Sequence, residues 1–149
     1  LNFLKSMSKT LNIKFKKLHD LAVIPSYAHA DDAGFGIYSI EEKVLKPMEY
    51  YAVATGISSE IPNDYFVSFR DRSSMAINGL HVMGGVIDSG YRGEWKVIMI
   101  NLGKEDYKIE VGDKVAQGIL QSAKQPKIEI VEDLSNTSRG EGGFGSTGR

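Results

Sequence analysis

The sequence predicts a single all-β domain, built as a sandwich or barrel of short strands. A chain of 149 residues with 42% hydrophobic residues favours one domain with a sizeable core. Short apolar runs recur along it, separated by turn signals such as Ile61-Pro62-Asn63-Asp64 and Asp88-Ser89-Gly90. Strands at this regular spacing are typical of sandwiches and barrels rather than of βαβ units.

The strands follow from alternation and from β-forming residues. Leu11, Ile13 and Phe15 alternate with polar residues, which predicts a half-buried strand. Four further strands are predicted, at Tyr50–Gly56, Tyr65–Arg70, Lys96–Asn101 and Lys127–Val131. Val97, Met99 and Val115 are expected in the core by base rate, with a threefold axis as the alternative.

Only one stretch of the sequence is typical of a helix. Ser74 is expected to cap a short turn over residues 75–78, and Gly79 is expected to end it. The rest of the chain is expected to be strands and turns.

Composition excludes several functional classes. The formal net charge is −1, which argues against a nucleic-acid coat or a membrane-surface protein. No apolar run reaches the ~20 residues that a membrane span needs. The chain has no cysteine, so disulfides and thiolate metal sites are excluded, while the redox compartment stays open. We expect no nucleic-acid and no membrane partner.

The two ends differ from the middle. Residues 1–8 are expected to be a tag or a disordered lead, with Met7 as the natural start, and residues 9–134 to form the β domain. Residues 135–149 are rich in glycine and small polar residues, which cannot bury enough surface to order themselves. They are expected to be disordered or to order on a ligand.

The glycine-rich tail has features of an anion-binding lid. Gly140, Gly142 and Gly145 match a G-x-G-x-x-G spacing, but the strand and helix of a dinucleotide motif do not flank them. A Walker A loop is also excluded, because no lysine precedes Ser146. Arg139 offers a phosphate fork, and Phe144 offers a ring on which a base could stack. A flexible tail without function is the alternative for a generic protein.

Five segments stand out in order along the chain: ADDAGFGIYS (30–39), DRSSMA (71–76), GVIDSGYRGE (85–94), GDKVAQGIL (112–120) and RGEGGFGSTG (139–148). Together they resemble the five motifs of the trimeric dUTPases. The resemblance implies a jelly-roll-like β barrel and a homotrimer whose active sites are shared among three subunits. It also implies a dUTP diphosphatase that uses Mg²⁺, splits dUTP into dUMP and pyrophosphate, and is cytoplasmic, with a nuclear or viral origin left open.

The resemblance assigns the catalytic role to Asp88. A carboxylate there would orient a water molecule and accept its proton as the water attacks the α-phosphorus. In an arbitrary protein, an aspartate in an Asp-Ser-Gly turn is more often a turn former. Tyr91 would pack against the deoxyribose and leave no room for a 2′-hydroxyl.

The resemblance also implies the remaining substrate contacts, motif by motif. The main chain of the hairpin around Gly84, Gly85, Val86 and Ile87 would read uracil. Arg72, Ser73 and Ser74 would hold the phosphates, and Gln117 would contact the phosphate chain. The tail residues Arg139, Phe144, Gly145, Ser146 and Thr147 would close over γ-phosphate and uracil from another subunit. Arg92 is expected to be structural, in a shared interface.

Position 36 departs from the family pattern. The family has an aspartate there that holds waters of the Mg²⁺ on the triphosphate, and this chain has Gly36. Asp31 and Asp32 are expected to point elsewhere, so no protein residue is assigned as a direct metal ligand. Asp71 also departs, since many relatives have proline there, and it is expected to face away or to pair with Arg70.

The sequence leaves three alternatives to a dUTP diphosphatase. A dCTP deaminase shares the fold, but our alignment places Ile98 where deaminases carry a glutamate, and isoleucine cannot relay a proton. A catalytically weakened nucleotide-binding or regulatory trimer is favoured by Gly36 and opposed by Asp88. A structural β trimer would have no use for the tail that carries Phe144.

Overall fold

The computed structural model describes residues 10–144, which form eleven strands and one short helix, α1 (Ser73–Ala76). The strands are β1 (Lys14–Lys17), β2 (Phe35–Tyr38), β3 (Lys43–Leu45), β4 (Tyr50–Ala54), β5 (Ile57–Glu60), β6 (Tyr65–Arg70), β7 (Leu80–Met83), β8 (Val86–Asp88), β9 (Lys96–Asn101), β10 (Tyr107–Ile109) and β11 (Lys114–Ser122). The expectations for residues 1–8 and for Gly145, Ser146 and Thr147 fall outside the described residues.

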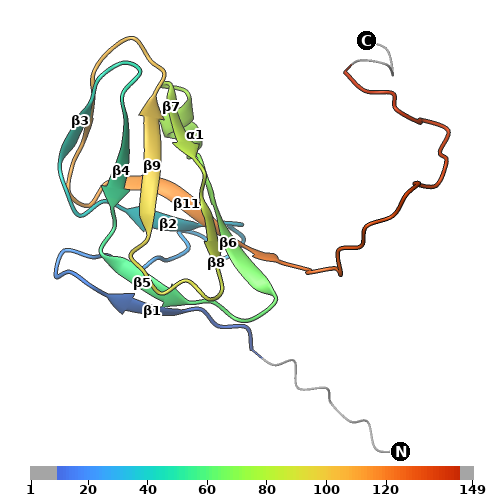
Figure 1. The fold of residues 1–149 in the computed structure, drawn as a ribbon. Coiled ribbons are helices and arrows are strands. Elements are labelled where there is room, and N and C mark those ends of the chain that lie inside the picture. The colour runs from blue at the N-terminus through green and yellow to red at the C-terminus, as the bar shows by residue number, and fades with distance from the viewer. Residues whose placement is uncertain (1–9, 145–149) are drawn as a thin grey trace, which may run out of the picture.

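The strands form four antiparallel sheets around one core (Figure 1). A four-stranded sheet has the order β2-β11-β6-β8, and a three-stranded sheet has the order β4-β9-β7. The pairs β1-β5 and β10-β3 complete the body. The expected all-β, jelly-roll-like architecture is confirmed, although the described strands do not close into one barrel.

Most of the predicted strands are present. β4, β6 and β9 begin at the predicted residues, and β1 occupies the second half of its predicted range. The predicted strand at Lys127–Val131 is wrong, because that segment pairs with nothing in the described chain. Its alternating pattern lacks the partner strand that a strand needs for stability.

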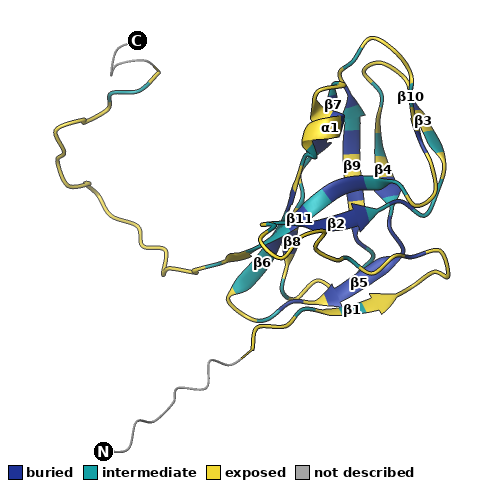
Figure 2. Cartoon of the chain, turned by 180° about the vertical axis from the view of Figure 1, so that it is seen from behind, coloured by how far each residue is buried: buried dark blue, intermediate teal, exposed yellow. Residues whose placement is uncertain are grey.

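Trp95 is the centre of the core. It is fully buried, and its ring lies 5.2 Å from that of Phe15 and 5.5 Å from that of Phe69, measured between ring centroids. Its indole Nε1 donates to Ser59 Oγ at 3.1 Å, which satisfies the buried polar atom. Figure 2 shows the buried stretches of β9 and β11 facing this interior. Val97, Met99 and Val115 are buried within the single chain, as expected for residues of the core.

β11 organises the part of the fold that carries the candidate site. It has nine residues and pairs with β2 on one side and β6 on the other. Gln117 therefore lies opposite Gly36 and also opposite Arg70. A register shift between Lys114 and Ala116 marks an irregularity in the β2–β11 ladder. These pairings bring residues from distant parts of the sequence to one end of the sheet.

The helix is close to its predicted place. Ser74 was expected as the N-cap, but Arg72 is the N-cap, and no side chain caps the helix. Gly79 has φ = 85°, a left-handed conformation that ends the turn as predicted. With four residues, α1 is far too short to cross a membrane, and the described chain has no other helix.

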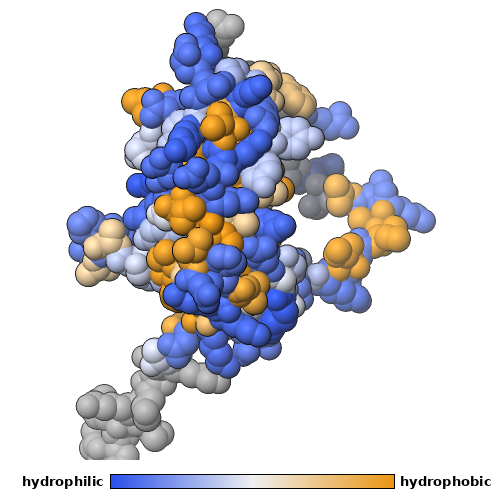
Figure 3. Space-filling view, turned by 90° about the vertical axis from the view of Figure 1, so that its left-hand side faces the viewer, coloured by the Kyte–Doolittle hydropathy of each residue, from blue (hydrophilic) through white to orange (hydrophobic). Residues whose placement is uncertain are grey.

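The last described segment runs away from the body as an extended arm (Figures 1 and 2). Ile128 and Ile130 are 92% and 101% exposed, and Leu134 is 86% exposed. Figure 3 shows hydrophobic side chains both on the surface of the body and on the chain that projects from it. A single chain leaves these side chains in water, which is unfavourable for aliphatic groups.

Candidate functional site

Two successive glycines shape the hairpin between β7 and β8. Gly84 and Gly85 have φ values of 67° and 94°, which residues with a Cβ rarely adopt. A Cβ on Gly85 would lie 2.9 Å from Phe69 Cβ. The Gly85 carbonyl oxygen accepts a hydrogen bond from Phe69 N at 2.7 Å. Glycine at these positions lets the hairpin lie against β6 and sets where β8 begins.

Asp88 is exposed at the end of β8. It lies opposite Phe66 in the β6–β8 ladder, and its carbonyl oxygen accepts a hydrogen bond from Tyr91 N at 3.1 Å. Within residues 10–144, its carboxylate makes no hydrogen bond and no ion pair with another side chain or backbone group. The carboxylate is therefore free to accept a hydrogen bond from water or from a ligand.

Asp88 and Tyr91 line an open pocket of about 660 Å³ over β8 and β9. The other lining residues are Ala52, Gly85, Val86, Ile87, Glu94, Lys96 and Ile98. Tyr91 Oη donates to the Glu94 carbonyl oxygen at 3.0 Å, which holds the ring in place. This size and the mixture of apolar and polar lining suit a small organic ligand. Gly84, which was predicted to contact substrate, does not line the pocket.

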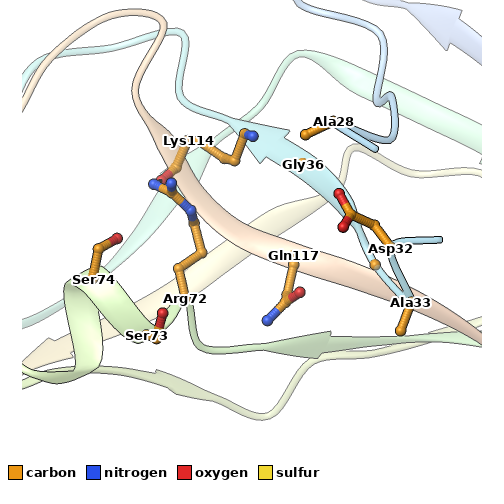
Figure 4. Close-up of a pocket in the computed structure, with 10 residues that line it drawn as sticks. Ala28, Asp32, Ala33, Gly36, Arg72, Ser73, Ser74, Lys114 and Gln117 are labelled. Atoms are coloured by element: carbon orange, nitrogen blue, oxygen red, sulfur yellow. Dashed lines mark hydrogen bonds between the residues drawn. The ribbon is translucent and has the colours of Figure 1, made fainter. Parts of the chain in front are cut away.

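A second pocket, of about 240 Å³, lies where β2, β11 and the start of α1 meet (Figure 4). Its lining includes Arg72, Ser73, Ser74 and Gln117, the four residues predicted to hold phosphates. Arg72 donates from a terminal guanidinium nitrogen to the Lys114 carbonyl oxygen at 2.7 Å. Gln117 donates from Nε2 to the Asp71 carbonyl oxygen at 2.9 Å. These bonds fix both side chains at the pocket.

Two charged residues of this pocket were not predicted. Asp32 lines it, although it was expected to point elsewhere, and it accepts a hydrogen bond from His29 N at 2.9 Å. A turn at residues 29–32 directs the Asp32 carboxylate toward the pocket. The expectation had assumed the alternation of a strand at this position. Lys114 also lines the pocket. Its position inside the GDKVAQ segment, three residues before Gln117, was the available signal.

The lining residues do not form a direct metal site. Within residues 10–144, no group of three or more histidine, aspartate or glutamate side chains is placed to hold a metal ion. The smaller pocket has one carboxylate, from Asp32, and two cations, from Arg72 and Lys114. Divalent Mg²⁺ prefers several oxygen ligands, so this donor set fits an anion that brings its own metal better than it fits a bare ion.

Asp71 takes the first of its two expected arrangements and faces away from the phosphate pocket. Its Oδ2 lies 2.7 Å from His81 Nδ1, and its Oδ1 accepts a hydrogen bond from Val82 N at 2.6 Å. It does not pair with Arg70 among the described residues. The carboxylate faces β7, away from the phosphate pocket, and ties the start of α1 to that strand.

Arg92 and the tail residues lie elsewhere. Arg92 donates to the carbonyl oxygens of Ser59 and Ser89, which is a structural role within one chain. Arg139 Nε donates to the Gly142 carbonyl oxygen at 2.8 Å, and Phe144 is fully exposed at 114%. Neither Arg139 nor Phe144 lines either of these two pockets, so the described part of the tail does not reach them.

The two pockets share no lining residue. Asp88 pairs with Phe66 near the beginning of β6, whereas Arg72 follows the end of that strand. Arg72 lies six residue steps of extended chain beyond Phe66, a distance of ~20 Å at a rise of ~3.3 Å per residue. The predicted catalytic and phosphate-binding residues of one chain therefore do not face a common ligand.

Comparisons with known proteins agree with one another. The dUTPase family model matches residues 20–148. A deoxyuridine 5'-triphosphate nucleotidohydrolase from Clostridium acetobutylicum is 45% identical over 141 residues, which cover 93% of this chain and 97% of that protein. The corresponding protein from Clostridioides difficile is 48% identical over 140 residues, which cover 92% of this chain and 98% of that protein.

Solved structures give the same answer. The dUTPase of Staphylococcus bacteriophage 80alpha, solved with dUpNHpp, is 28% identical with a TM-score of 0.89, and the match covers 94% of this chain and 100% of that chain. A mutant dUTPase from phage phi11 of S. aureus, described with a structural Mg(II) ion, is 25% identical with a TM-score of 0.78, and the match covers 83% of this chain and 98% of that chain.

Proposed function

Because the chain belongs to the dUTPase family, we propose that it hydrolyses dUTP to dUMP and pyrophosphate. This reaction removes the precursor of uracil in DNA and supplies dUMP for thymidylate synthesis. Both clostridial relatives are named as nucleotidohydrolases, and neither of the two is named as a deaminase or a regulator. The deaminase and weakened-binder alternatives therefore have no support.

The observation that carries the proposal is the carboxylate of Asp88, which is exposed at the mouth of a pocket and has no partner among the described residues. A water molecule that donates a hydrogen bond to this carboxylate is held in one orientation and becomes more nucleophilic. Its oxygen bonds to the α-phosphorus while its proton passes to Asp88. The bond from the α-phosphorus to the bridging oxygen breaks, and pyrophosphate leaves with that oxygen.

The pocket that holds Asp88 also suits the nucleoside. Tyr91, fixed by its bond to the Glu94 carbonyl oxygen, presents a ring face against which a deoxyribose packs. Gly85, Val86 and Ile87 offer backbone donors and acceptors to a uracil edge. In the proposal, the tight hairpin at Gly84 and Gly85 excludes the methyl group of thymine.

The smaller pocket suits the phosphate chain. Arg72 and the hydroxyl groups of Ser73 and Ser74 supply a guanidinium and two further donors at one opening. Charge-assisted hydrogen bonds of this kind are the strong ones in anion binding. Gln117, oriented by the Asp71 carbonyl oxygen, lies at the same opening.

Mg²⁺ is part of the proposal as an ion that arrives with the triphosphate. It would neutralise phosphate charge and so favour attack at the α-phosphorus. Asp32, the carboxylate that lines this pocket, would accept hydrogen bonds from its waters. The remaining residues of the pocket position the phosphates without coordinating the ion directly.

A homotrimer with shared sites is part of the proposal, and the separation of the two pockets supports it. A complete site needs Asp88 from one copy and Arg72 from another, because the two lie ~20 Å apart along one strand. The arm that carries Ile128, Ile130 and Leu134 supports this assembly, since association is the ordinary way to cover exposed aliphatic side chains. A third copy would supply Arg139 and Phe144 from its tail.

The proposal is tested by measuring pyrophosphate release from dUTP at saturating Mg²⁺, with dTTP, dCTP and UTP as controls. Release from dUTP alone is the expected result. Equal release from UTP would contradict the role given to Tyr91, and no release from any of the four nucleotides would overturn the proposed function. Mass measurement of the same sample, by sedimentation, should give three times the chain mass of 16.4 kDa.

A further inference from the structure

Gly36 and Lys114 fit together as a pair across the β2–β11 ladder. Gly36 is buried on β2, and a Cβ at that position would lie 2.6 Å from Lys114 Cε and 3.0 Å from Lys114 Cδ. The alkyl chain of Lys114 therefore fills the volume that any side chain at position 36 would need. Figure 4 shows this side chain extended from β11 across Gly36 at the edge of the smaller pocket.

Lys114 has no carboxylate partner among the described residues. Its Nζ lies 5.7 Å from the centroid of the Tyr38 ring, within the range of a cation–π contact. Other lysines of the chain, such as Lys14 and Lys43, form ion pairs with glutamates. Arg72, the second cation of the pocket, donates to a carbonyl oxygen rather than to a carboxylate.

The pocket therefore has an excess of positive charge. Its single carboxylate, from Asp32, already accepts a hydrogen bond from His29 N. Two half-buried cations in one pocket of about 240 Å³ repel one another, and a polyanion relieves that repulsion. A triphosphate is the polyanion that the proposed function places there.

We infer that Lys114 is a phosphate-binding residue of this site, and that its ammonium group supplies much of the charge neutralisation that a divalent cation would otherwise supply. The inference rests on the proposed function for the identity of the ligand. An aspartate at position 36 would place a carboxylate beside Lys114 and pair with it, which would withdraw the ammonium group from the phosphates. Glycine at position 36 leaves the ammonium group available, so nucleotide binding depends only weakly on Mg²⁺.

The test is a set of calorimetric titrations of dUpNHpp and dUMP, each in EDTA and in Mg²⁺. In dUpNHpp an NH group replaces the bridging oxygen next to the α-phosphorus, so the nucleotide can be titrated without turnover. The variants are Lys114→Met, which keeps the alkyl packing over Gly36, Lys114→Arg, and Gly36→Asp. Lys108→Met is the matched control, because Lys108 is exposed on β10 and pairs with Glu110. Thermal midpoints of all variants verify folding.

Unmodified protein should bind dUpNHpp with similar affinity in EDTA and in Mg²⁺. Lys114→Met should weaken that binding about tenfold or more in EDTA and clearly less in Mg²⁺, since a lost charge-assisted contact has about this effect. Lys114→Arg should keep the affinity for dUpNHpp in EDTA. Gly36→Asp should make dUpNHpp binding depend on Mg²⁺. The affinity for dUMP should change little in all of these variants. If Lys114→Met weakens dUpNHpp binding equally in EDTA and in Mg²⁺, or does not weaken it, the inference is overturned and the proposed function is unaffected. Failure of unmodified protein to bind either nucleotide would overturn the proposed function as well.

Discussion

Asp88 and Arg72 lie near opposite ends of strand β6. Asp88 faces Phe66 across the β6–β8 ladder, and Arg72 follows the last residue of the strand, Arg70. The two groups with the clearest chemical roles are thus held apart by the strand that joins them. In the proposed trimer, Asp88 of one copy and Arg72 of another act on the same nucleotide.

Asp88→Asn is expected to lower kcat for dUTP by about a thousandfold, because positioned general bases contribute ~10²–10⁴-fold. Binding of dUpNHpp should be nearly unchanged, since the amide keeps the shape of the side chain. The measurement is a steady-state assay of pyrophosphate release beside a calorimetric titration. Asp106→Asn, in an exposed loop, is the control. Retention of kcat by the Asp88 variant would remove this residue from the mechanism.

Mixing Asp88→Asn with Arg72→Met should restore activity that neither parent has. In randomly mixed trimers, about a quarter of the sites combine an intact Asp88 from one parent with an intact Arg72 from the other. The assay is pyrophosphate release after the two variants are refolded together, compared with each variant refolded alone. No recovery in a sample shown to contain mixed trimers would mean that both residues come from the same chain.

Gly84→Ala and Gly85→Ala form a matched pair. Both residues have positive φ, so each substitution should cost about 1–2 kcal/mol of stability. A Cβ at Gly84 meets nothing within 4 Å, whereas one at Gly85 meets Phe69 Cβ at 2.9 Å. Overpacking should add about 1–3 kcal/mol at Gly85 alone. Urea unfolding at one protein concentration compares the two, and equal losses would contradict the close approach to Phe69.

Phe144→Ala should raise KM for dUTP and leave stability unchanged. The side chain is fully exposed at 114%, so its removal uncovers no core. Loss of base stacking is worth ~1–3 kcal/mol, which corresponds to a rise in KM of roughly fivefold or more. Phe144→Trp should keep a low KM, because the larger ring still stacks. An unaltered KM for the alanine variant would argue against a role for the tail ring in binding.

Glu49→Gln should lower stability near neutral pH but not in acid. A hydrogen bond from Lys43, together with one from Lys46 N, holds the pKa of Glu49 below its usual range. A carboxylate with a depressed pKa in the folded state contributes stability above the unfolded pKa, and that contribution is lost as the pH falls through the folded pKa. The difference between the two proteins in thermal midpoint should therefore shrink below about pH 4.5. Glu105→Gln, in an exposed loop, is the control.

Sequence patterns predicted the body of the fold better than its arm. β6 and β9 were predicted at their observed bounds, because each alternates clearly between buried and exposed residues. β11, the longest strand, was not predicted, since Gly118 interrupts its β-forming residues and the segment resembled a binding motif. Residues 127–131 have the alternation of a strand without a partner in the chain. The sequence of a strand that pairs with another chain does not differ from the sequence of a strand that pairs within its own chain.

The candidate site was predicted in its parts but not in its grouping. Arg72, Ser73 and Gln117 meet at one pocket as the motifs suggest. The contact between Gly36 and Lys114 was not predicted, because it depends on the strand register and on the irregularity between Lys114 and Ala116. Such register information lies in the pairing of distant segments rather than in either segment alone.

The exposed arm links the association of the protein to its concentration. A chain with Ile128 and Ile130 in water gains by association, so the balance between lone and assembled chains obeys mass action. With the proposed trimer as the active form, dilution would lower both the activity per chain and the midpoint of thermal unfolding, and added substrate would oppose both changes by drawing chains into assemblies. A cell that makes little of this protein therefore obtains less than a proportional share of its activity.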